Sequence, residues 1–278
     1  MLTRDLDDPL SRPEGYVAER DAFAIEPRSA MITSPAVRQW WESSVISDYP
    51  SALGYLAPIF VHYANAVNRA GGITPQARRA DISSRPSSSM HMLEDDPELM
   101  DRVKRISCRV FGQTLTLDPL SNSVQLRVGK SDVPVPPVDA ITPEYRKSII
   151  QLEPLHEQGD GMTAVLGLLV PIICGNQRIV LVDEPEAFLH PPQARIVGTI
   201  LGELAGERNL QLLLATHDRN MLVGLLQSGA PVTILRLERQ EARTFINVLD
   251  HEHVRELWDD PVLRYSNVLD GPGQPRSS

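Results

Sequence analysis

With 278 residues, the chain can bury a sizeable core, either as one large domain or as two small ones. Hydrophobic residues make up 42% and charged residues 23%, which is ordinary for a globular protein, and the formal net charge of −9 argues against a dominant basic surface. No apolar stretch is long enough to span a membrane, and the acidic N-terminus lacks the apolar core of a secretory signal. These features predict a cytoplasmic protein without a membrane partner, in which Cys108 and Cys174 are reduced thiols.

The first third of the chain gives mixed signals. Polar, Pro-rich residues over 1–30 predict irregular structure, whereas 37–45 and 51–69 have helical apolar spacing, interrupted in the second stretch by Pro58. Residues 71–89 are rich in Gly, Ser, Pro and Arg, and this composition predicts a flexible loop.

Residues 96–111 carry clearer helix signals. Asp96 is a suitable N-cap and Pro97 is a typical first helical residue. Beyond this stretch, apolar and polar side chains alternate over 113–117 and 124–128 on either side of a turn. This alternation predicts a β-hairpin.

From Gly161 onward, short aliphatic runs alternate with amphipathic ones, which predicts an α/β fold with helices flanking a parallel, buried sheet. The predicted helices span 162–174, 192–205 and 219–227, and the predicted strands span 179–182, 211–215, 232–237 and 244–249. We therefore divide the chain into an irregular and helical region (1–95), an α/β core part (96–250), and a C-terminal helix with a disordered tail (251–278).

Two carboxylates follow the first aliphatic strand of this core part. Asp183 and Glu184 come directly after IVLV, and the ligand sites of parallel sheets lie beyond the carboxyl ends of the strands. One carboxylate there can hold Mg²⁺, usually through water, and the next can polarise the attacking water in phosphoryl transfer. Asp183 is accordingly the predicted metal-binding residue and Glu184 a predicted catalytic residue. The alternative is a plain solvated loop, which the following PEAFLHP disfavours.

A histidine ends the next aliphatic run, LLLAT. His217 stands where a neighbouring strand would bring it beside the carboxylates, and Asp218 follows as a helix cap. From that position an imidazole can donate a hydrogen bond to a terminal phosphate. The pairing of the two strands favours a catalytic role for His217 over that of an ordinary surface or core histidine.

A glycine-rich loop precedes the helix predicted over 162–174. Gly159 and Gly161 allow a close backbone approach, Asp160 can act as a cap, and the helix that follows presents free amide groups to an anion. The alternative for this loop is a flexible turn before a core helix.

The motifs from Gln158 to Leu226 together resemble the C-terminal part of an ABC-type ATPase head, as in the SMC, RecF and OLD-like AAA ATPases. IVLVDEPE is similar to the Walker B strand with its catalytic glutamate, AFLHPPQ to the D-loop, and LLLATHD to the switch-histidine strand. QGDGM stands where these families place their signature loop, although it departs from the usual SGG-type core.

The resemblance implies a P-loop NTPase-like fold that uses ATP and Mg²⁺. It also implies a homo- or heterodimer in which Gly159, Asp160 and Gly161 act on the γ-phosphate held by the opposite subunit. His190, in the stretch similar to the D-loop, is expected to contact the nucleotide as well.

One part of such a head is not apparent in the sequence. Gly129-Lys130-Ser131 is the only GK[ST] in the chain, but Val124 stands where the phosphate-loop pattern needs glycine, and the prolines that follow exclude the required helix. We therefore expect the Walker A loop, and the Toprim domain found in OLD-like proteins, to lie outside this chain. This would leave an incomplete core, as in a truncated product or one half of a split ATPase.

Three functions are compatible with these motifs. The first is an ATPase that a partner carrying Walker A completes, in DNA metabolism or phage defence. The second is a catalytically inactive remnant that acts as a dimerising or regulatory module. The third is a scaffold that contacts DNA through Arg78, Arg79 and Arg85, although arginines in a Ser-rich loop are more often solvated surface. A P-loop encoded directly upstream would favour the first function.

Overall fold

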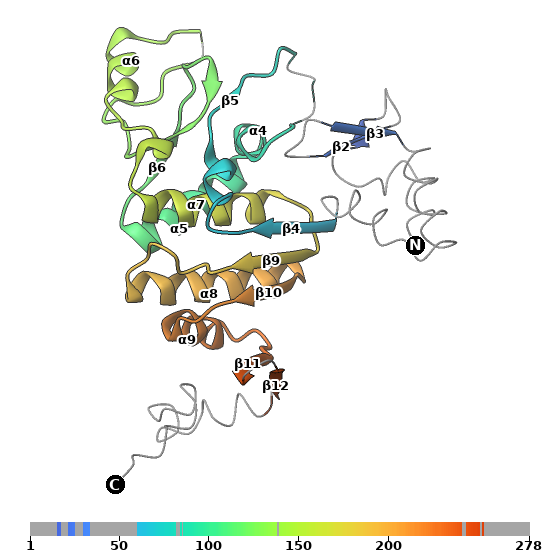
Figure 1. The fold of residues 1–278 in the computed structure, drawn as a ribbon. Coiled ribbons are helices and arrows are strands. Elements are labelled where there is room, and N and C mark those ends of the chain that lie inside the picture. Colours follow the sequence, from blue (N-terminus) through green and yellow to red (C-terminus); the bar gives the residue numbers. More distant parts are fainter. Residues whose placement is uncertain are drawn as a thin grey trace.

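The computed structural model describes residues 60–250 except 82, 83, 85, 138, 241 and 242, together with residue 252 and the backbone of three strands nearer the N-terminus (Figure 1). The helix predicted over 37–45, the first part of the one predicted over 51–69, and the chain from residue 253 onward lie outside the described residues.

The three N-terminal strands form a small antiparallel sheet. They are β1 (Tyr16–Val17), β2 (Ala22–Ile25) and β3 (Ala30–Thr33), and they pair in that order. The prediction of irregular structure over 1–30 is therefore wrong for these segments, whose short length gives little periodicity to detect.

A three-stranded parallel sheet lies at the centre of the fold. Its order is β10 (Gln211–Ala215), β9 (Ile179–Asp183) and β4 (Val61–Ala64), with β9 in the middle. With helices beside it, this sheet confirms the predicted α/β class. The helix predicted over 51–69 is wrong where β4 runs, because a short apolar stretch does not distinguish strand from helix and pairing with β9 decides the outcome.

One face of this sheet packs on the hydrophobic core. Val180 and Val182 of β9 are buried there. On the opposite face the register aligns Tyr63, Leu181 and Leu213, and the outer two are 51% and 57% exposed. Within the described part of the chain the sheet is therefore covered on one side, rather than buried throughout as predicted.

Six helices and two 3-10 turns are described: α4 (Ser89–Asp95), α5 (Pro97–Phe111), α6 (Pro143–Ile150), α7 (Asp160–Cys174), α8 (Pro191–Arg208), α9 (Arg219–Gln227), η2 (Arg69–Ile73) and η3 (Leu155–Glu157). Helix α5 packs against α7 and α8, and α9 lies beneath α8 (Figure 1). The sequence analysis misses α4 and α6, although the hydroxyls of Ser88 and Thr142 cap them.

The predicted caps set the bounds of α5. The Asp96 carboxylate accepts hydrogen bonds from the backbone N–H groups of Glu98 and Leu99 at 2.9 and 3.2 Å. Pro97 is the first helical residue, and Gly112 ends the helix with a φ of 67°, in the left-handed region that glycine adopts without strain. The helix predicted over 96–111 is thereby confirmed.

The predicted hairpin is also present. β6 (Leu115–Leu117) pairs antiparallel with β8 (Leu126–Val128). Between them, β7 (Ser123–Val124) pairs instead with β5 (Gln76–Ala77). Together with η2, β5 gives regular structure to part of the stretch predicted as a flexible loop over 71–89.

The turn between β6 and β7 is held by a buried carboxylate. Asp118 is 1% exposed, and its carboxylate accepts hydrogen bonds from Ser121 Oγ at 2.6 Å, Arg127 Nε at 2.7 Å and Gln125 Nε2 at 3.1 Å. Burial raises the pKa of Asp118, but the hydrogen bonds from Ser121, Arg127 and the Leu120 amide outweigh it and lower the pKa to about 2.

We expect Asp118→Ala to lower the free energy of unfolding by about 3 kcal/mol, because it leaves the buried Arg127 guanidinium without its counter-charge. The stabilisation by the ionised carboxylate is complete above the unfolded-state pKa of 3.8 and is lost as the pH falls through about 2. Urea unfolding at about pH 6 and about pH 3 measures this dependence. If the difference in the free energy of unfolding between the unmodified chain and the variant does not narrow at the lower pH, this pH dependence is contradicted.

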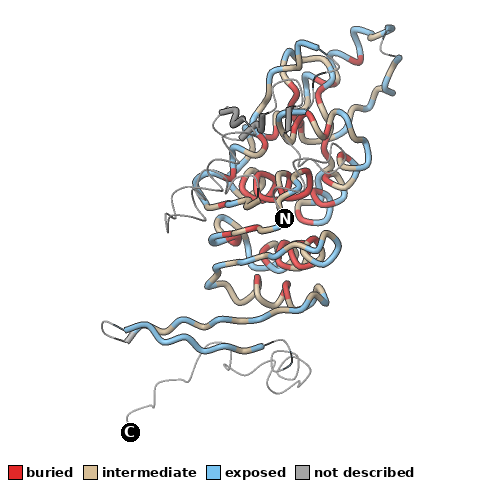
Figure 2. The backbone as a smooth tube through the Cα atoms, turned by 90° about the vertical axis from the view of Figure 1, so that its right-hand side faces the viewer, coloured by how far each residue is buried: buried red, intermediate tan, exposed pale blue. Residues whose placement is uncertain are grey.

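The last two predicted strands do not join the parallel sheet. β11 (Ile234–Gln240) and β12 (Arg243–Leu249) pair antiparallel with each other and stand off from the other described elements (Figure 2). Leu235 and Leu237 remain 61% and 66% exposed. The two strands thus lie where they are predicted, but they do not pair with the predicted sheet. The spacing of apolar residues indicates that a segment is a strand, and it does not indicate which strand it pairs with.

None of the described helices is long and apolar enough to cross a lipid bilayer. Cys108 is exposed on α5, and Cys174 is buried at the end of α7.

Candidate functional site

The carboxyl ends of β9 and β10 lie side by side and carry the predicted catalytic residues. The register pairs Asp183, the last residue of β9, with Ala215, the last residue of β10. Glu184 follows β9 and His217 lies two residues beyond β10, so both emerge at the same edge of the sheet. Asp183 and Glu184 are exposed, as groups that act on a ligand must be.

The backbone of Glu184 is held in an unusual conformation. Its φ is 48°, in the left-handed region, which costs a non-glycine residue on the order of 1–2 kcal/mol. Its N–H donates to the carbonyl oxygen of Ala215 at 2.9 Å, and its own carbonyl oxygen accepts from the N–H of Ala187 at 3.0 Å. These contacts fix the direction in which the Glu184 side chain leaves the backbone.

His217 links two acidic side chains of this edge. Its Nδ1 lies 3.8 Å from Glu184 Oε1 and 3.4 Å from Glu186 Oε1, and its backbone N–H donates to Glu186 Oε1 at 3.2 Å. The side chains of His217 and Glu184 are 79% and 55% exposed, whereas that of Glu186 is 7% exposed. The two acids therefore differ in what they can do: Glu184 can meet a ligand, and Glu186 can hold His217.

Arg69 is a further member of the site that is not predicted from the sequence. It opens η2 and is 2% exposed, and its Nη2 donates to the carbonyl oxygens of both Asp183 and Glu184, the second at 2.8 Å. Burial lowers the pKa of Arg69, and the negative charges of Glu186, Asp183 and Glu184 partly offset this. No local pattern marks such a residue, because its partners lie more than a hundred positions away.

The glycine-rich loop begins α7 beside the stretch that follows the carboxylates. Gly159 is the N-cap of α7 and has no neighbour within 4 Å of where a Cβ would stand, whereas a Cβ on Gly161 would lie 2.9 Å from the carbonyl oxygen of Phe188. Asp160 is the first residue of the helix and is exposed, as is Gly159. The structure thus brings the predicted signature-like loop next to the predicted D-loop.

His190 is placed at the other end of that stretch. It is the N-cap of α8, is exposed, and donates its backbone N–H to Gln193 Oε1 at 3.3 Å. No contact joins it to Glu184 or His217 within the described residues.

The Gly129-Lys130-Ser131 segment takes a different shape from a phosphate loop. Gly129 donates its N–H to the Thr114 carbonyl at 2.9 Å, next to the paired strands β6 and β8, and Ser131 Oγ lies 2.7 Å from Ser148 Oγ of α6. No helix begins at Ser131.

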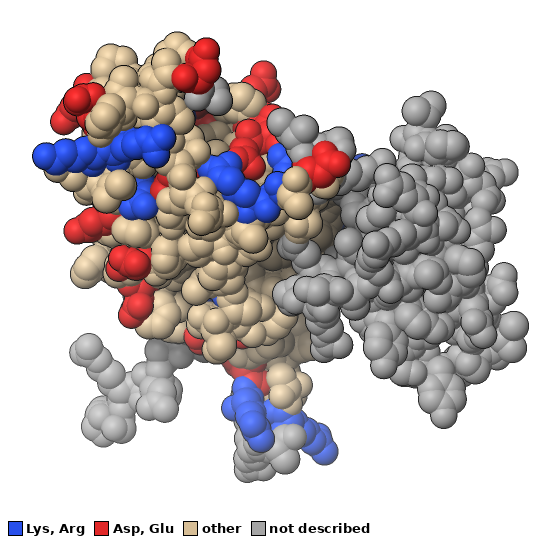
Figure 3. Space-filling model, turned by 90° about the horizontal axis from the view of Figure 1, so that it is seen from above, with Lys and Arg blue, Asp and Glu red and all other residues tan. Residues whose placement is uncertain are grey.

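Two of the three arginines considered for DNA contact bind within the chain. Arg78 pairs with Glu94 and donates to the carbonyl of Ser121 at 2.8 Å, and Arg79 pairs with Asp95. Basic and acidic side chains are interspersed on the face shown in Figure 3. The third arginine, Arg85, lies outside the described residues.

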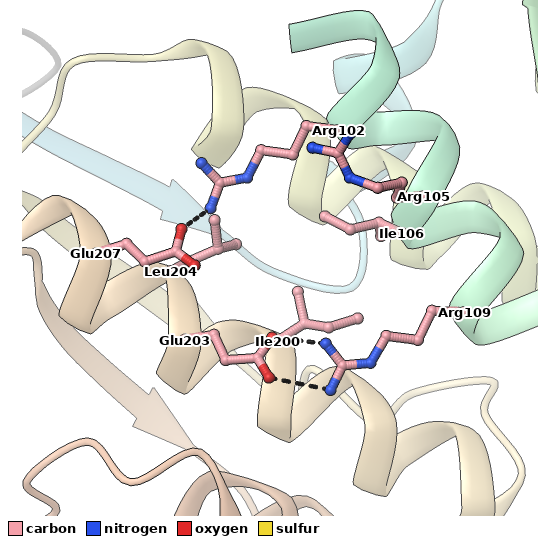
Figure 4. Close-up of a pocket in the computed structure, with 8 residues that line it drawn as sticks. All are labelled: Arg102, Arg105, Ile106, Arg109, Ile200, Glu203, Leu204 and Glu207. Atoms are coloured by element: carbon pink, nitrogen blue, oxygen red, sulfur yellow. Dashed lines mark hydrogen bonds and ion pairs between the residues drawn. The ribbon is translucent and has the colours of Figure 1, made fainter. Parts of the chain in front are cut away.

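A cavity of about 470 Å³ lies away from these residues, between α5 and α8 (Figure 4). Two ion pairs span it: Arg102 with Glu207, and Arg109 with Glu203, the latter through two contacts of 2.6 and 3.1 Å. None of the predicted site residues lines it. Ion pairs that are partly exposed to water contribute little to stability, and here they tie two helices together.

Asp183 provides the kind of donor that Mg²⁺ accepts. It is an exposed carboxylate at a strand end, and this ion takes one or two protein carboxylates while keeping water and phosphate ligands. The described residues contain no group of three or more His, Cys, Asp or Glu side chains that would form a complete cage for a metal.

A parallel sheet with helices beside it occurs in many α/β proteins, so the fold alone does not assign a function. Residues 38–223 match the family described as "AAA domain, putative AbiEii toxin, Type IV TA system", and the chain belongs to this family. No curated protein matches the chain.

The chain is also similar to several solved structures of SMC proteins. A structure from work on ATP-driven dimerization and DNA-stimulated activation of SMC ATPases is 12% identical, covering 64% of this chain and 99% of that one, with a TM-score of 0.41. The Smc head bound to the C-winged helix domain of ScpA is 13% identical, covering 74% of this chain and 62% of that one, with a TM-score of 0.49. A third structure is the Smc head domain with an extended coiled coil, bound to the C-terminal domain of ScpA, from Pyrococcus furiosus. It is 12% identical, covering 60% of this chain and 38% of that one, with a TM-score of 0.42. The family assignment rests on the matched sequence and not on these structures.

Proposed function

We propose that this chain contributes the Mg²⁺-holding and water-activating residues of an ATP-hydrolysing site that a second, P-loop-bearing subunit completes. The observation that carries the proposal is the meeting of Asp183, Glu184 and His217 at the carboxyl ends of two paired strands. Membership in an AAA family supports ATP as the nucleotide.

Each residue has a distinct proposed role. Asp183 holds Mg²⁺, which when bound offsets negative charge on the phosphate oxygens. Glu184, exposed and with its backbone fixed, accepts a proton from the attacking water. His217 donates a hydrogen bond toward the terminal phosphate, and Glu186 orients it.

The start of α7 faces the partner in this proposal. Gly159, Asp160 and Gly161 place amide groups of a helix N-terminus at an exposed position, where they can meet the γ-phosphate held by the other subunit. His190 contributes at the same dimer face. We propose that the assembly acts in the cytoplasm, in DNA metabolism or phage defence; the family description, which names a putative toxin, supports the latter.

A second candidate is a dimerising module that does not hydrolyse ATP. It is supported by the contacts on either side of Lys130, where Gly129 donates to the Thr114 carbonyl beside the β6–β8 hairpin and Ser131 Oγ lies close to Ser148 Oγ. Both candidates predict ATP-dependent association with a P-loop-bearing subunit. Hydrolysis in the mixture separates them: turnover that depends on Glu184 supports the first, and association without turnover supports the second.

We expect Gly159→Arg to abolish ATP-dependent association. Among the described residues, none lies within 4 Å of a Cβ added at Gly159, so the added side chain would act on the partner and not on the described fold. Gly161 is a poorer probe, since its Cβ would already meet the Phe188 carbonyl. Size-exclusion chromatography with and without ATP measures the effect, and Gly206→Arg, another open glycine but on α8, is the matched control. Normal association of the Gly159 variant would mean that this loop is merely a turn.

A further inference from the structure

The buried guanidinium of Arg69 sits directly beneath the acidic pair. Its Nη2 donates to the carbonyl oxygens of Asp183 and Glu184, while its Nε and Nη1 have no hydrogen-bond partner within the described part of the chain. An arginine is among the costliest side chains to bury with donors unpaired, and such a group calls for an explanation beyond packing.

The backbone of Arg69 is locked in place by a close contact with α7. A Cβ on Gly167 would lie 2.1 Å from the Arg69 carbonyl oxygen, and a Cβ on Gly72 would lie 2.4 Å from the Gly167 carbonyl oxygen. Only glycine at both positions lets η2 and the buried middle of α7 approach so closely. The backbone position from which the Arg69 side chain extends is therefore fixed, as is the sheet that the side chain reaches.

Arg69 acts on the one strained residue of the acidic pair. Glu184 has a left-handed backbone, and its carbonyl oxygen accepts from Arg69 at 2.8 Å and from the Ala187 N–H at 3.0 Å. The same nitrogen also donates to the preceding carbonyl, of Asp183, so one guanidinium nitrogen bridges the carbonyl oxygens of the two acids. Glutamine is shorter and uncharged, and lysine carries its charge on a strongly hydrated ammonium instead of a planar guanidinium.

Resting on the function proposed above, we propose that Arg69 is a positioning residue, which holds the Asp183–Glu184 turn so that the Glu184 carboxylate is directed at the attacking water. It touches neither nucleotide nor water in this role. Its effect passes through the backbone of the turn.

Arg208 supplies a matched control. It too donates to backbone carbonyls, those of Ile172, Ile173 and Gly175, but at the far end of α7. Arg69→Gln and Arg208→Gln therefore each remove a guanidinium that donates to backbone carbonyls. Only the contact made by Arg69 lies at the acidic pair. Arg69→Lys keeps the charge and tests how much of the effect needs the guanidinium itself.

The first measurement is hydrogen exchange on the full chain, which needs no ATP. The amide of Glu184, bonded to the Ala215 carbonyl, is expected to exchange faster in Arg69→Gln and at the unmodified rate in Arg208→Gln. Arg69→Lys should fall between, and it serves in place of Arg69→Gln if that variant does not fold. Unchanged exchange at Glu184 in both Arg69 variants would overturn the proposal.

The second measurement is ATP turnover with a P-loop-bearing subunit. We expect Arg69→Gln to lower kcat about 10²-fold with KM little changed, as a misdirected general base does, and Arg208→Gln to keep the unmodified kcat. Equal losses in the two variants would reduce Arg69 to a structural clamp and overturn the proposal. Absence of turnover with the unmodified chain would instead contradict the proposed function, and the exchange data would still decide whether Arg69 holds the turn.

Discussion

Glu184→Gln is expected to lower ATP turnover by about 10²–10⁴-fold in a mixture with a P-loop-bearing subunit, while ATP stays bound and the subunits stay associated. Glutamine keeps the size of the side chain and one acceptor oxygen, but it cannot take a proton from water. The Glu184 side chain is exposed and its main contacts are made through the backbone, so the substitution leaves the fold intact.

Turnover and association are measured on the same samples, by phosphate release and by size-exclusion chromatography with ATP. The control is Glu203→Gln, which alters an acidic side chain of α8 that pairs with Arg109 away from the site. The control should hydrolyse ATP at the unmodified rate. Loss of association in the Glu184 variant would indicate a role in binding rather than in water activation.

Asp183→Asn is expected to raise the Mg²⁺ concentration needed for nucleotide binding about 10- to 100-fold, because an amide is a weaker partner than a carboxylate for this hard cation or its bound water. The Asp183 side chain is exposed at the end of β9, and its tie to Arg69 is made by the backbone carbonyl, which the substitution retains. Nucleotide binding titrated at several Mg²⁺ concentrations measures the effect. A variant that binds normally at low Mg²⁺ would show that Asp183 does not serve the metal.

The sequence predicts the second half of the fold well because the elements there are long enough to show their periodicity. Helices α7, α8 and α9 and strands β9 and β10 all lie where expected. The edge of the site was predictable for the same reason: once two parallel strands are placed, the residues after their carboxyl ends must come together, as Glu184 and His217 do.

Other parts of the site depend on contacts that no local pattern records. β4 is four residues long and its spacing fits a helix, so neither the third strand of the sheet nor Arg69 beside it was predicted. Glu186 is buried and supports His217, a contact fixed by the turn after β9 and not by spacing.

The most direct test of the account is a comparison of ATP turnover by Glu184→Gln and Glu186→Gln, side by side in the same mixture. Glu186→Gln keeps an oxygen that can accept the His217 N–H, so a milder defect is expected, whereas Glu184→Gln should lower turnover by about 10²–10⁴-fold. Near-normal turnover by Glu184→Gln together with its loss in Glu186→Gln would place the base two residues further along the chain and contradict the assignment made here.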